Sequence, residues 1–499
     1  MRLCLNKEKA LSLVDKAFDY FGNLYAVAII LLIPLYYQNF YFDTLEAKWS
    51  IYVFITTLFI FPFSLLFIIK IINGYTPKVN KWDIFAVIFC LSVILGNMFS
   101  EYPQQSFTGS SGWRLGTLYM ILCIFTYFSI KQTNISIKLL FFVFLIMYSL
   151  INLLASLNIL GFDPLLFKNA MIESEKTKYI STIGNINWFG AFMSLAFPII
   201  SILFIISKKV FIKIILGILN AISLFNIVLC NSDCALLSIL GIIIFLIYCT
   251  VTKKDYYKDF GLYFIISGLA LVLIDYIVSY KINIRIENLQ KIITSWSLGL
   301  IVIVFGVFLC INTGAHNNSH KRVSVCTFFI LIIVYFLIFK DYIIEYLDFN
   351  YSWGNNRGYI WNYVIEIYSG NTTIKKLFGT GCDTFGIYAT LYFQNDIITI
   401  WNKQLVNAHN ELLQLLVTTG IIGTVSYYIT MIFPIVKSIK SNDVFKISVA
   451  ISLTTYLVQQ LVNNMQTVTT PLCFVLLSLL NVLIYTDSET NRTIINSHL

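Results

Sequence analysis

The sequence predicts an all-α, polytopic membrane protein with about 12–14 transmembrane helices and one large outer loop that carries short helices. Composition is the first observation that predicts this fold class. Of the 499 residues, 58% are hydrophobic and only 12% are charged, whereas a soluble domain carries roughly 25% charged residues. The second observation is that apolar runs of about 20 residues, enough for a helix to cross a bilayer, recur along the chain. A soluble enzyme, a nucleic-acid-binding protein and a disordered chain are therefore excluded.

The predicted spans fall into two groups separated by one long polar stretch. Residues 1–340 contain about eleven spans, residues 341–408 form the polar stretch, and residues 409–499 contain about three spans and a short tail. The start of the chain is polar and charged, so no cleavable signal peptide is expected. In order, the predicted spans are 24–42, 50–72, 82–99, 114–130, 139–160, 187–206, 210–230, 234–252, 260–280, 294–312, 323–340, 409–433, 444–461 and 467–486.

The basic residues of the short loops predict the orientation, because Lys and Arg are enriched in cytoplasmic loops. If the N-terminus is cytoplasmic, four lysine clusters fall inside, whereas the outer loops near 231–233 and 462–466 contain no Lys or Arg. The outer loop near 281–291 is basic and runs against this rule. We therefore expect both termini in the cytoplasm and residues 341–408 outside. The four clusters are Lys70, Lys78 and Lys81; Lys208, Lys209 and Lys213; Lys253, Lys254 and Lys258; and Lys437, Lys440 and Lys446.

Polar residues at membrane depth gather toward the outer ends of the predicted helices. This placement predicts a polar cavity that opens to the outer face, because polar groups in a bilayer are costly unless they pair or line a wet cavity. Helix capping is the alternative interpretation. A transporter would instead place polar sites near the midplane, in two related halves, and neither is found. The polar residues are Asn97, Asn152, Asn158, Asn185, Asn187, Asn231, Asp233, Asp275, Asn463, Asn464 and Gln466.

Neither a metal site nor a disulfide framework is expected. The ten cysteines form no CxxC pair and no cluster with histidine, so they fit buried thiols that act as small apolar residues. The outer segments also lack the clustered carboxylates of a metal–diphosphate site. We therefore expect chemistry without a metal or another cofactor.

Of the four histidines, His409 is the candidate general base. It lies where the 341–408 stretch enters a predicted helix, and a helix N-terminus disfavours the imidazolium form of a nearby ring. His316 falls in a short loop predicted to be cytoplasmic. The alternative is that Asn407 and His409 merely cap the helix.

Two arginines lie on the same predicted outer side. Arg357 follows Trp353-Gly-Asn-Asn, and Arg114 lies within the glycine-rich run 109–116. A guanidinium is a planar fork suited to phosphate oxygens. Stacking of Arg357 on Trp361 or contact with lipid phosphate is the alternative. The glycines of 377–386 lack the strand–helix context of a nucleotide site and predict a turn.

Five runs, in order, resemble the motifs of the O-antigen ligase and polysaccharide polymerase family. The run that begins with His409-Asn-Glu-Leu-Leu-Gln is similar to the family's HNxxLQ…GxxG pattern, and the resemblance covers about 109–430. A further run departs from the family pattern. Asn231-Ser-Asp-Cys-Ala stands where many members carry Ser-Arg-Gly, so the arginine of that motif is absent. Arg285 is a candidate substitute for it. The other four resembling runs are 112–116, 182–190, 357–361 and 379–386.

This resemblance implies a polytopic glycosyltransferase with a GT-C-like fold. Such an enzyme would transfer or polymerise a glycan from a polyprenyl-diphosphate donor onto an acceptor sugar at the outer face of the cytoplasmic membrane. Because the diphosphate is itself the leaving group, neither nucleotide nor nucleic acid is needed, and the partners would be the donor, the acceptor and membrane lipid. Whether the protein acts as a ligase or as a polymerase remains open. The alternative function is a non-enzymatic exporter of lipid-linked glycans.

The resemblance also assigns roles to individual residues. His409 would act as general base, and Arg357 would stabilise the departing diphosphate. The implied substrate-binding residues are Arg114, Arg285, Asn185, Asn187, Asn410 and Glu411.

Overall fold

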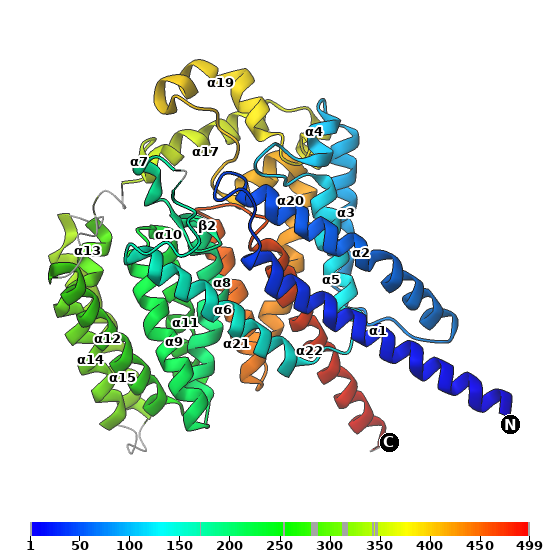
Figure 1. Ribbon diagram of the computed structural model, residues 1–499, viewed down its shortest axis with the longest axis horizontal. Helices are drawn as coiled ribbons and strands as arrows, with labels where there is room; N and C mark the ends of the chain where they lie inside the picture. The colour runs from blue at the N-terminus through cyan, green and yellow to red at the C-terminus, as the bar shows by residue number, and fades with distance from the viewer. Residues whose placement is uncertain are drawn as a thin grey trace. The chain divides into compact units, whose positions relative to one another are not determined.

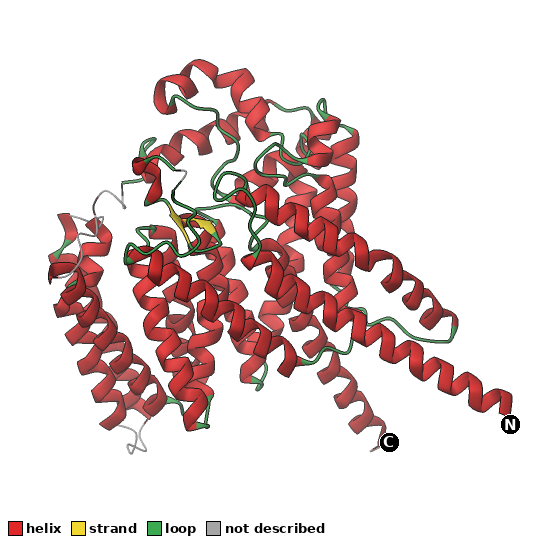
Figure 2. Ribbon diagram, in the orientation of Figure 1, coloured by secondary structure: helices red, strands yellow, loops and turns green. Residues whose placement is uncertain are grey.

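The computed structural model describes residues 2–169, 171–252, 255–280, 288–311, 318–341, 344 and 348–497. Helices make up most of this part of the chain, and the strands shown in Figure 2 form one short hairpin. The prediction of an all-α fold is confirmed.

The chain divides into two compact units. Unit 1 comprises residues 1–148, 361–441 and 464–499, and unit 2 comprises residues 149–360 and 442–463. The division falls within α6 (Ile137–Ile159) and α17 (Trp353–Gly370). Figure 1 labels the elements of both units.

Unit 1 consists of helices. They are α1 (Arg2–Leu35), α2 (Thr44–Ile72), α3 (Asp83–Met98), α4 (Pro103–Thr108), α5 (Thr117–Gln132), α18 (Thr373–Phe378), α19 (Phe385–Trp401), α20 (Glu411–Ile439) and α22 (Thr470–Ser497).

Unit 2 contains the hairpin of β1 (Tyr179–Ile180) and β2 (Gly184–Asn185), which are antiparallel with Ile180 opposite Gly184. The hairpin leads directly into α8. The helices of the unit are α7 (Glu173–Lys176), α8 (Ile186–Ile206), α9 (Val210–Leu229), α10 (Asp233–Leu236), the 3-10 helix η1 (Leu237–Ile239), α11 (Leu240–Thr252), α12 (Tyr257–Tyr280), α13 (Asn288–Thr294), α14 (Trp296–Ile311), α15 (Asn318–Ile338) and α21 (Val444–Gln460).

Each predicted span overlaps a helical segment. Within the described ranges, eight segments are long and apolar enough to cross a membrane: Leu11–Leu35, Thr44–Ile72, Ile137–Ile159, Ile186–Ile206, Val210–Leu229, Asp233–Thr252, Tyr257–Ser279 and Glu411–Ile439. Shorter apolar helices cover Asp83–Met98, Trp296–Ile311, Val325–Ile338 and Thr470–Thr486. The two remaining predicted spans correspond to the more polar helices α5 and α21.

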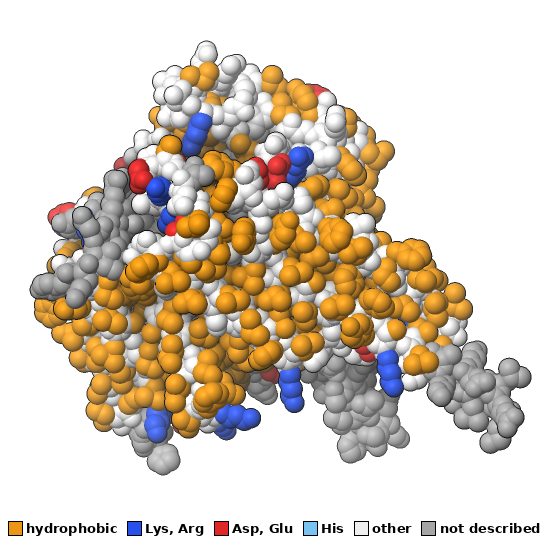
Figure 3. Space-filling view, viewed as in Figure 1, with side chains coloured by type: hydrophobic (Ala, Val, Ile, Leu, Met, Phe, Trp, Pro, Cys, Tyr) orange, Lys and Arg blue, Asp and Glu red, His pale blue; other side chains and the backbone are white. Residues whose placement is uncertain are grey.

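The surface agrees with a membrane environment. On the face shown in Figure 3, hydrophobic side chains cover the helices, and charged side chains gather near helix ends. Phe61 of α2 and Phe211 of α9 are each 74% exposed, which suits contact with lipid rather than water. The chain is a multi-pass membrane protein.

The first span ends earlier than predicted. The sequence predicts a span over 24–42, but α1 already begins at Arg2 and stops at Leu35. The buried Lys48 ammonium donates hydrogen bonds to the carbonyl oxygens of Ile33 and Pro34, at 3.0 and 2.9 Å. These carbonyls belong to the last turn, where helix C=O groups lack helical partners, so Lys48 caps α1 and the apolar residues after Leu35 form a turn.

Glycines bring two helices of unit 2 into backbone contact. A Cβ atom on Gly268 of α12 would lie 2.6 Å from the carbonyl oxygen of Gly299 in α14, and one on Gly261 would lie 2.6 Å from that of Gly306. Small residues allow this close approach between helices in membranes. The two glycine pairs therefore make α12 and α14 a tightly packed antiparallel pair.

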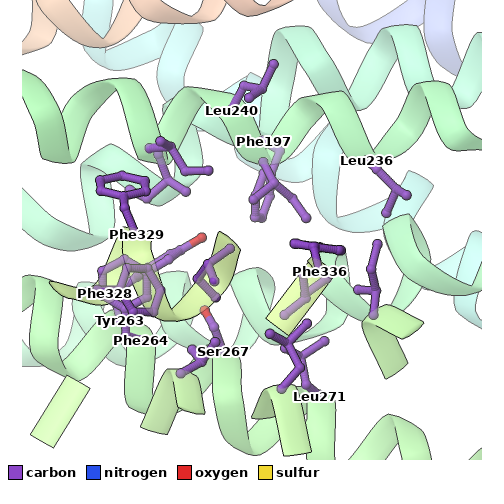
Figure 4. A pocket seen from close by; sticks show the side chains of 18 residues that line it. Phe197, Leu236, Leu240, Tyr263, Phe264, Ser267, Leu271, Phe328, Phe329 and Phe336 are labelled. Carbon is purple, nitrogen blue, oxygen red and sulfur yellow. The ribbon is translucent and has the colours of Figure 1, made fainter. Parts of the chain in front are cut away.

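An apolar cavity of about 280 Å³ lies within unit 2, among residues of α8 to α15 (Figure 4). Leucine, isoleucine and phenylalanine side chains, such as Leu240, Phe197 and Phe328, make up most of its lining, and Tyr263 and Ser267 contribute hydroxyl groups. The described residues that line the cavity are uncharged.

The polar stretch 341–408 contains short helices, as predicted. They are α17, α18 and α19. Three consecutive residues at the start of α17, Gly354, Asn355 and Asn356, have left-handed backbone conformations. The regular right-handed turns of α17 therefore begin at Arg357.

Candidate functional site

Hydrogen bonds from three directions hold the loop that carries His409, in unit 1. The Asn410 side chain caps α20 by accepting the Leu413 N–H at 3.1 Å, which satisfies one of the free donors of a helix N-terminus. The Gln414 side chain accepts the Ala408 N–H at 2.9 Å, and the Trp361 indole N–H donates to the Ala408 carbonyl at 3.2 Å. The loop is therefore fixed on both sides of His409.

His409 has a left-handed backbone conformation, with φ of 49°. This region is uncommon for residues other than glycine, and such strain gathers at functional sites. Its N–H donates to the Asn407 side chain at 3.1 Å, and the residue is half-buried. His409 thus lies at the mouth of α20, where the sequence predicts it.

Glu411 is turned into the protein. Its side chain is 1% exposed, and its carboxylate accepts the Met465 N–H at 2.5 Å. This bond ties the start of α20 to the segment that leads into α22. Asn410 and Glu411, both predicted to bind substrate, therefore each make a hydrogen bond that shapes the His409 loop.

A turn over residues 379–384 braces α20 from the other side. α20 breaks at Gly420, which has φ of 68° and ψ of −179°. The carbonyls of Val417 and Thr418 accept the N–H groups of Thr380 and Gly381 instead, at 2.9 and 3.0 Å. The glycine-rich run 379–386 begins as a turn, as predicted, and this turn replaces the hydrogen bonds lost where α20 breaks.

The same turn holds the loop that carries Arg114. The Asp383 carboxylate accepts the N–H and hydroxyl of Ser110, at 2.6 and 2.7 Å, and the N–H of Leu115 at 3.3 Å. Burial raises the pKa of Asp383 to about 6, although the Ser110 and Leu115 donors favour the ionised form. Through this turn, the Arg114 loop and the His409 helix are attached to one support.

Arg114 lies against two residues of α2. Its Nε donates to the Glu46 carboxylate at 2.8 Å, and its Cζ lies 5.6 Å from the centre of the Trp49 ring. Glu46 also accepts the Gly112 N–H at 3.1 Å. No pattern in the sequence indicates that α2 contacts Arg114.

In unit 2, Arg357 lies beside the start of α10. Its guanidinium forms a hydrogen bond with the Cys234 thiol, and the thiol also donates to the Val462 carbonyl at 3.9 Å. Asp233, which precedes the cysteine, accepts the Gln290 amide at 3.0 Å. Where the family pattern places an arginine on this helix, the chain thus brings the guanidinium of Arg357 to it from α17.

Asn187 belongs to the same region, which we call the α10 cluster: Asn187, Ser232, Cys234, Arg357 and Asn463. The Asn187 side chain accepts the Ser232 hydroxyl at 2.7 Å, and its carbonyl accepts the Asn463 amide at 3.1 Å. The sequence marks Asn463 only by its polarity near a helix end, and it gives no signal for the contact of Cys234 with Arg357.

Asn185 caps α8. Its side chain accepts the Asn187 N–H at 2.8 Å, so the asparagine orients the helix that carries Asn187.

The predicted residues thus fall into two sets. Arg114, His409, Asn410 and Glu411 belong to unit 1. Asn185, Asn187 and Arg357 belong to unit 2. Arg285 and His316 lie outside the described residues. Within the described ranges, no group of three His, Cys, Asp or Glu side chains is placed to hold a metal ion.

Comparison with known families gives a match to part of the chain. Residues 218–428 match the family described as O-antigen ligase, and no curated protein matches the chain. The matched range contains Arg357, His409 and the turn that braces α20, whereas Arg114 and Asn185 precede it. Residues 218–428 are thus similar to the O-antigen ligase family.

Proposed function

We propose that the protein transfers, or polymerises, a glycan from a polyprenyl-diphosphate donor onto an acceptor sugar at the outer face of the cytoplasmic membrane. The family match and the apolar helices establish the coarser statement, a membrane glycosyltransferase of the O-antigen ligase or polymerase type. The donor, the acceptor and the side of the membrane belong to the proposal.

The backbone of His409 is the observation that carries the proposal. A half-buried histidine is held in a strained conformation at a helix mouth by its neighbours on both sides. Packing alone does not need such a conformation, which costs about 1–3 kcal/mol. A histidine on a backbone held in this way suits a general base, which must stand within hydrogen-bonding reach of the proton that it removes.

In the proposed reaction, His409 removes the proton from a hydroxyl of the acceptor sugar. The oxygen of that hydroxyl forms a bond to the anomeric carbon of the donor sugar. The bond between that carbon and the diphosphate oxygen breaks, and the diphosphate leaves with the electron pair. The Arg357 guanidinium stabilises the charge that develops on the leaving group. Arg357 is half-buried, and its guanidinium forms a hydrogen bond with the Cys234 thiol at the start of α10.

A transfer assay tests the proposal. Purified protein in detergent is mixed with a polyprenyl-diphosphate-linked glycan and an acceptor, and the product is resolved by mass. Loss of the general base in His409→Ala is expected to slow transfer by about 10²–10⁴-fold. His316→Ala is expected to be nearly silent, because the sequence predicts that this histidine is cytoplasmic. Wild-type turnover by His409→Ala would reject the role of the base.

The same assay separates the alternatives. A lipid-anchored core sugar as the acceptor reports ligase activity, and a second lipid-linked repeat unit reports polymerase activity. An exporter would move the donor across a vesicle membrane and leave its mass unchanged. Because the proposed chemistry needs no metal, transfer is expected to continue in the presence of a chelator.

A further inference from the structure

Two residues of α2 hold the Arg114 guanidinium in unit 1. Glu46 and Trp49 are three residues apart on α2, so they share one face of the helix. Glu46 accepts a hydrogen bond from Nε at 2.8 Å, and the Trp49 ring lies 5.6 Å from Cζ. An acid and an aromatic ring thus fix the position of the guanidinium from two sides.

The arrangement leaves the other edge of the guanidinium available. Glu46 is bonded to Nε, and within the described part of the chain no hydrogen bond involves Nη1 or Nη2 of Arg114. The side chain is 31% exposed. Two parallel N–H groups on such an edge match two oxygens of one phosphoryl group.

A second donor at the same place lacks a partner. The indole N–H of Trp49 is buried, and none of the described residues accepts a hydrogen bond from it. A buried donor without an acceptor costs stability, and each such group in a native protein calls for an explanation such as a bound ligand or water. An acceptor that a ligand supplies beside Arg114 would satisfy this indole N–H.

The loop that carries Arg114 is held in place before any ligand arrives. Glu46 accepts the Gly112 N–H at 3.1 Å and the Ser111 hydroxyl at 3.4 Å, and Asp383 anchors Ser110. Arg114 itself has a left-handed φ of 56°. An arginine that is already ordered loses less rotational freedom when it binds.

We infer that Glu46 and Trp49 are positioning residues that direct the free edge of Arg114 toward a phosphoryl group of the lipid-linked donor. The identity of that ligand rests on the proposed function. Glu46 sets the angle of the guanidinium through Nε, and Trp49 supports its face and supplies one more N–H donor. The competing account is an ion pair that only fastens residues 110–114 to α2, and it predicts a loss of stability without a loss of binding.

Binding of farnesyl diphosphate to the full-length protein in detergent tests the inference. Glu46→Ala is expected to weaken binding about tenfold, as loss of one charge-assisted interaction does. Glu46→Gln keeps an oxygen for Nε and is expected to restore most of the affinity. Trp49→Phe keeps the ring but removes the N–H, and about threefold weaker binding is expected. Glu101→Gln is the control, because Glu101 is an exposed acid of the same unit that pairs with Lys375.

Two further readouts separate positioning from folding. In the transfer assay, Glu46→Ala is expected to raise KM for the donor with little change in kcat, whereas a purely structural change lowers the melting temperature and the amount of active protein. Farnesyl diphosphate affinity equal to wild type in both Glu46→Ala and Trp49→Phe would overturn the inference, as would absence of binding to the wild type. If Glu46→Ala fails to fold, Glu46→Gln and Trp49→Phe decide, and wild-type affinity in Trp49→Phe then overturns it.

The inference and the proposed function can fail separately. Glu46-dependent binding of farnesyl diphosphate by a protein that transfers no glycan would retain the inference and reject the function. If glycan transfer depends on His409 but Glu46→Ala has the wild-type KM for the donor, the proposed function is retained and the inference is rejected.

Discussion

Gly379 and Gly420 bring the backbones of two distant segments of unit 1 into direct contact. A Cβ atom on Gly379 would lie 2.2 Å from the carbonyl of Thr418, and one on Gly420 would lie 2.4 Å from the carbonyl of Leu377. Both glycines also have left-handed φ angles, 84° and 68°. Only glycine satisfies both the space and the conformation at these positions. This contact lies where α20 breaks at Gly420, so it helps to set the direction of the first part of α20, which begins next to His409.

We expect Gly379→Ala and Gly420→Ala to destabilise the protein by about 2–4 kcal/mol each, because each adds a backbone clash to a strained conformation. The loss of stability is measured by heating each variant in detergent and using gel filtration to determine how much folded protein remains at each temperature. Gly370→Ala is the matched control, since a Cβ atom there meets nothing within 4 Å, and a change within about 0.5 kcal/mol is expected. Equal melting temperatures for all three variants would show that the two backbones do not cross as described.

Arg357→Ala is expected to reduce transfer by about 10²–10³-fold if the guanidinium stabilises the leaving diphosphate. Arg357→Lys is expected to recover little, because a point charge does not replace a planar fork. Lys178→Ala is the control, since Lys178 is an exposed cation of unit 2 that pairs with Glu175. Initial rates at saturating donor give kcat. Activity near wild type in Arg357→Lys would reduce the role of Arg357 to that of a general positive charge.

The sequence predicts the helices well because lipid imposes a simple requirement on every span, namely an apolar run of sufficient length. It also predicts the place of His409, because that depends on where one helix begins. The early end of α1 was missed, since the cap comes from Lys48 on the next helix.

Side-chain partners are harder to predict because they come from segments far apart in the chain. Asp383 and Ser110 are separated by 273 positions, and no local pattern joins them. The burial of Glu411 and the contact between Cys234 and Arg357 likewise depend on tertiary packing. The pattern of the sequence therefore locates the candidate residues, whereas the structure is needed to say what holds each one.

The orientation in the membrane is a further prediction. A cysteine at Thr373, in the 341–408 stretch, is expected to react with a membrane-impermeant maleimide in intact cells, because the lysine-rich loops are expected inside. A cysteine at Asn442, between α20 and α21, is expected to react only after the membrane is permeabilised. Both positions are exposed, so access to the reagent depends on the side of the membrane. The background variant lacks Cys326, which is also exposed. The opposite pattern of labelling would place His409 on the cytoplasmic side and reject the proposed site.

The stability of unit 1 is expected to depend on pH through Asp383. Burial raises its pKa from 3.8 to about 6, so folding favours the protonated carboxyl. The resulting stabilisation is complete below about pH 4 and is lost as the pH rises through 6, which corresponds to about 1–3 kcal/mol over this interval. Asp383→Asn cannot titrate and removes this dependence.

We therefore expect the melting temperature of the wild type, relative to that of Asp383→Asn, to rise when the pH is lowered from 7.5 to 5. Comparison with the variant cancels the contributions of all other titrating groups. A constant difference between the two proteins across this range would mean that the Ser110 and Leu115 donors outweigh burial and keep Asp383 ionised.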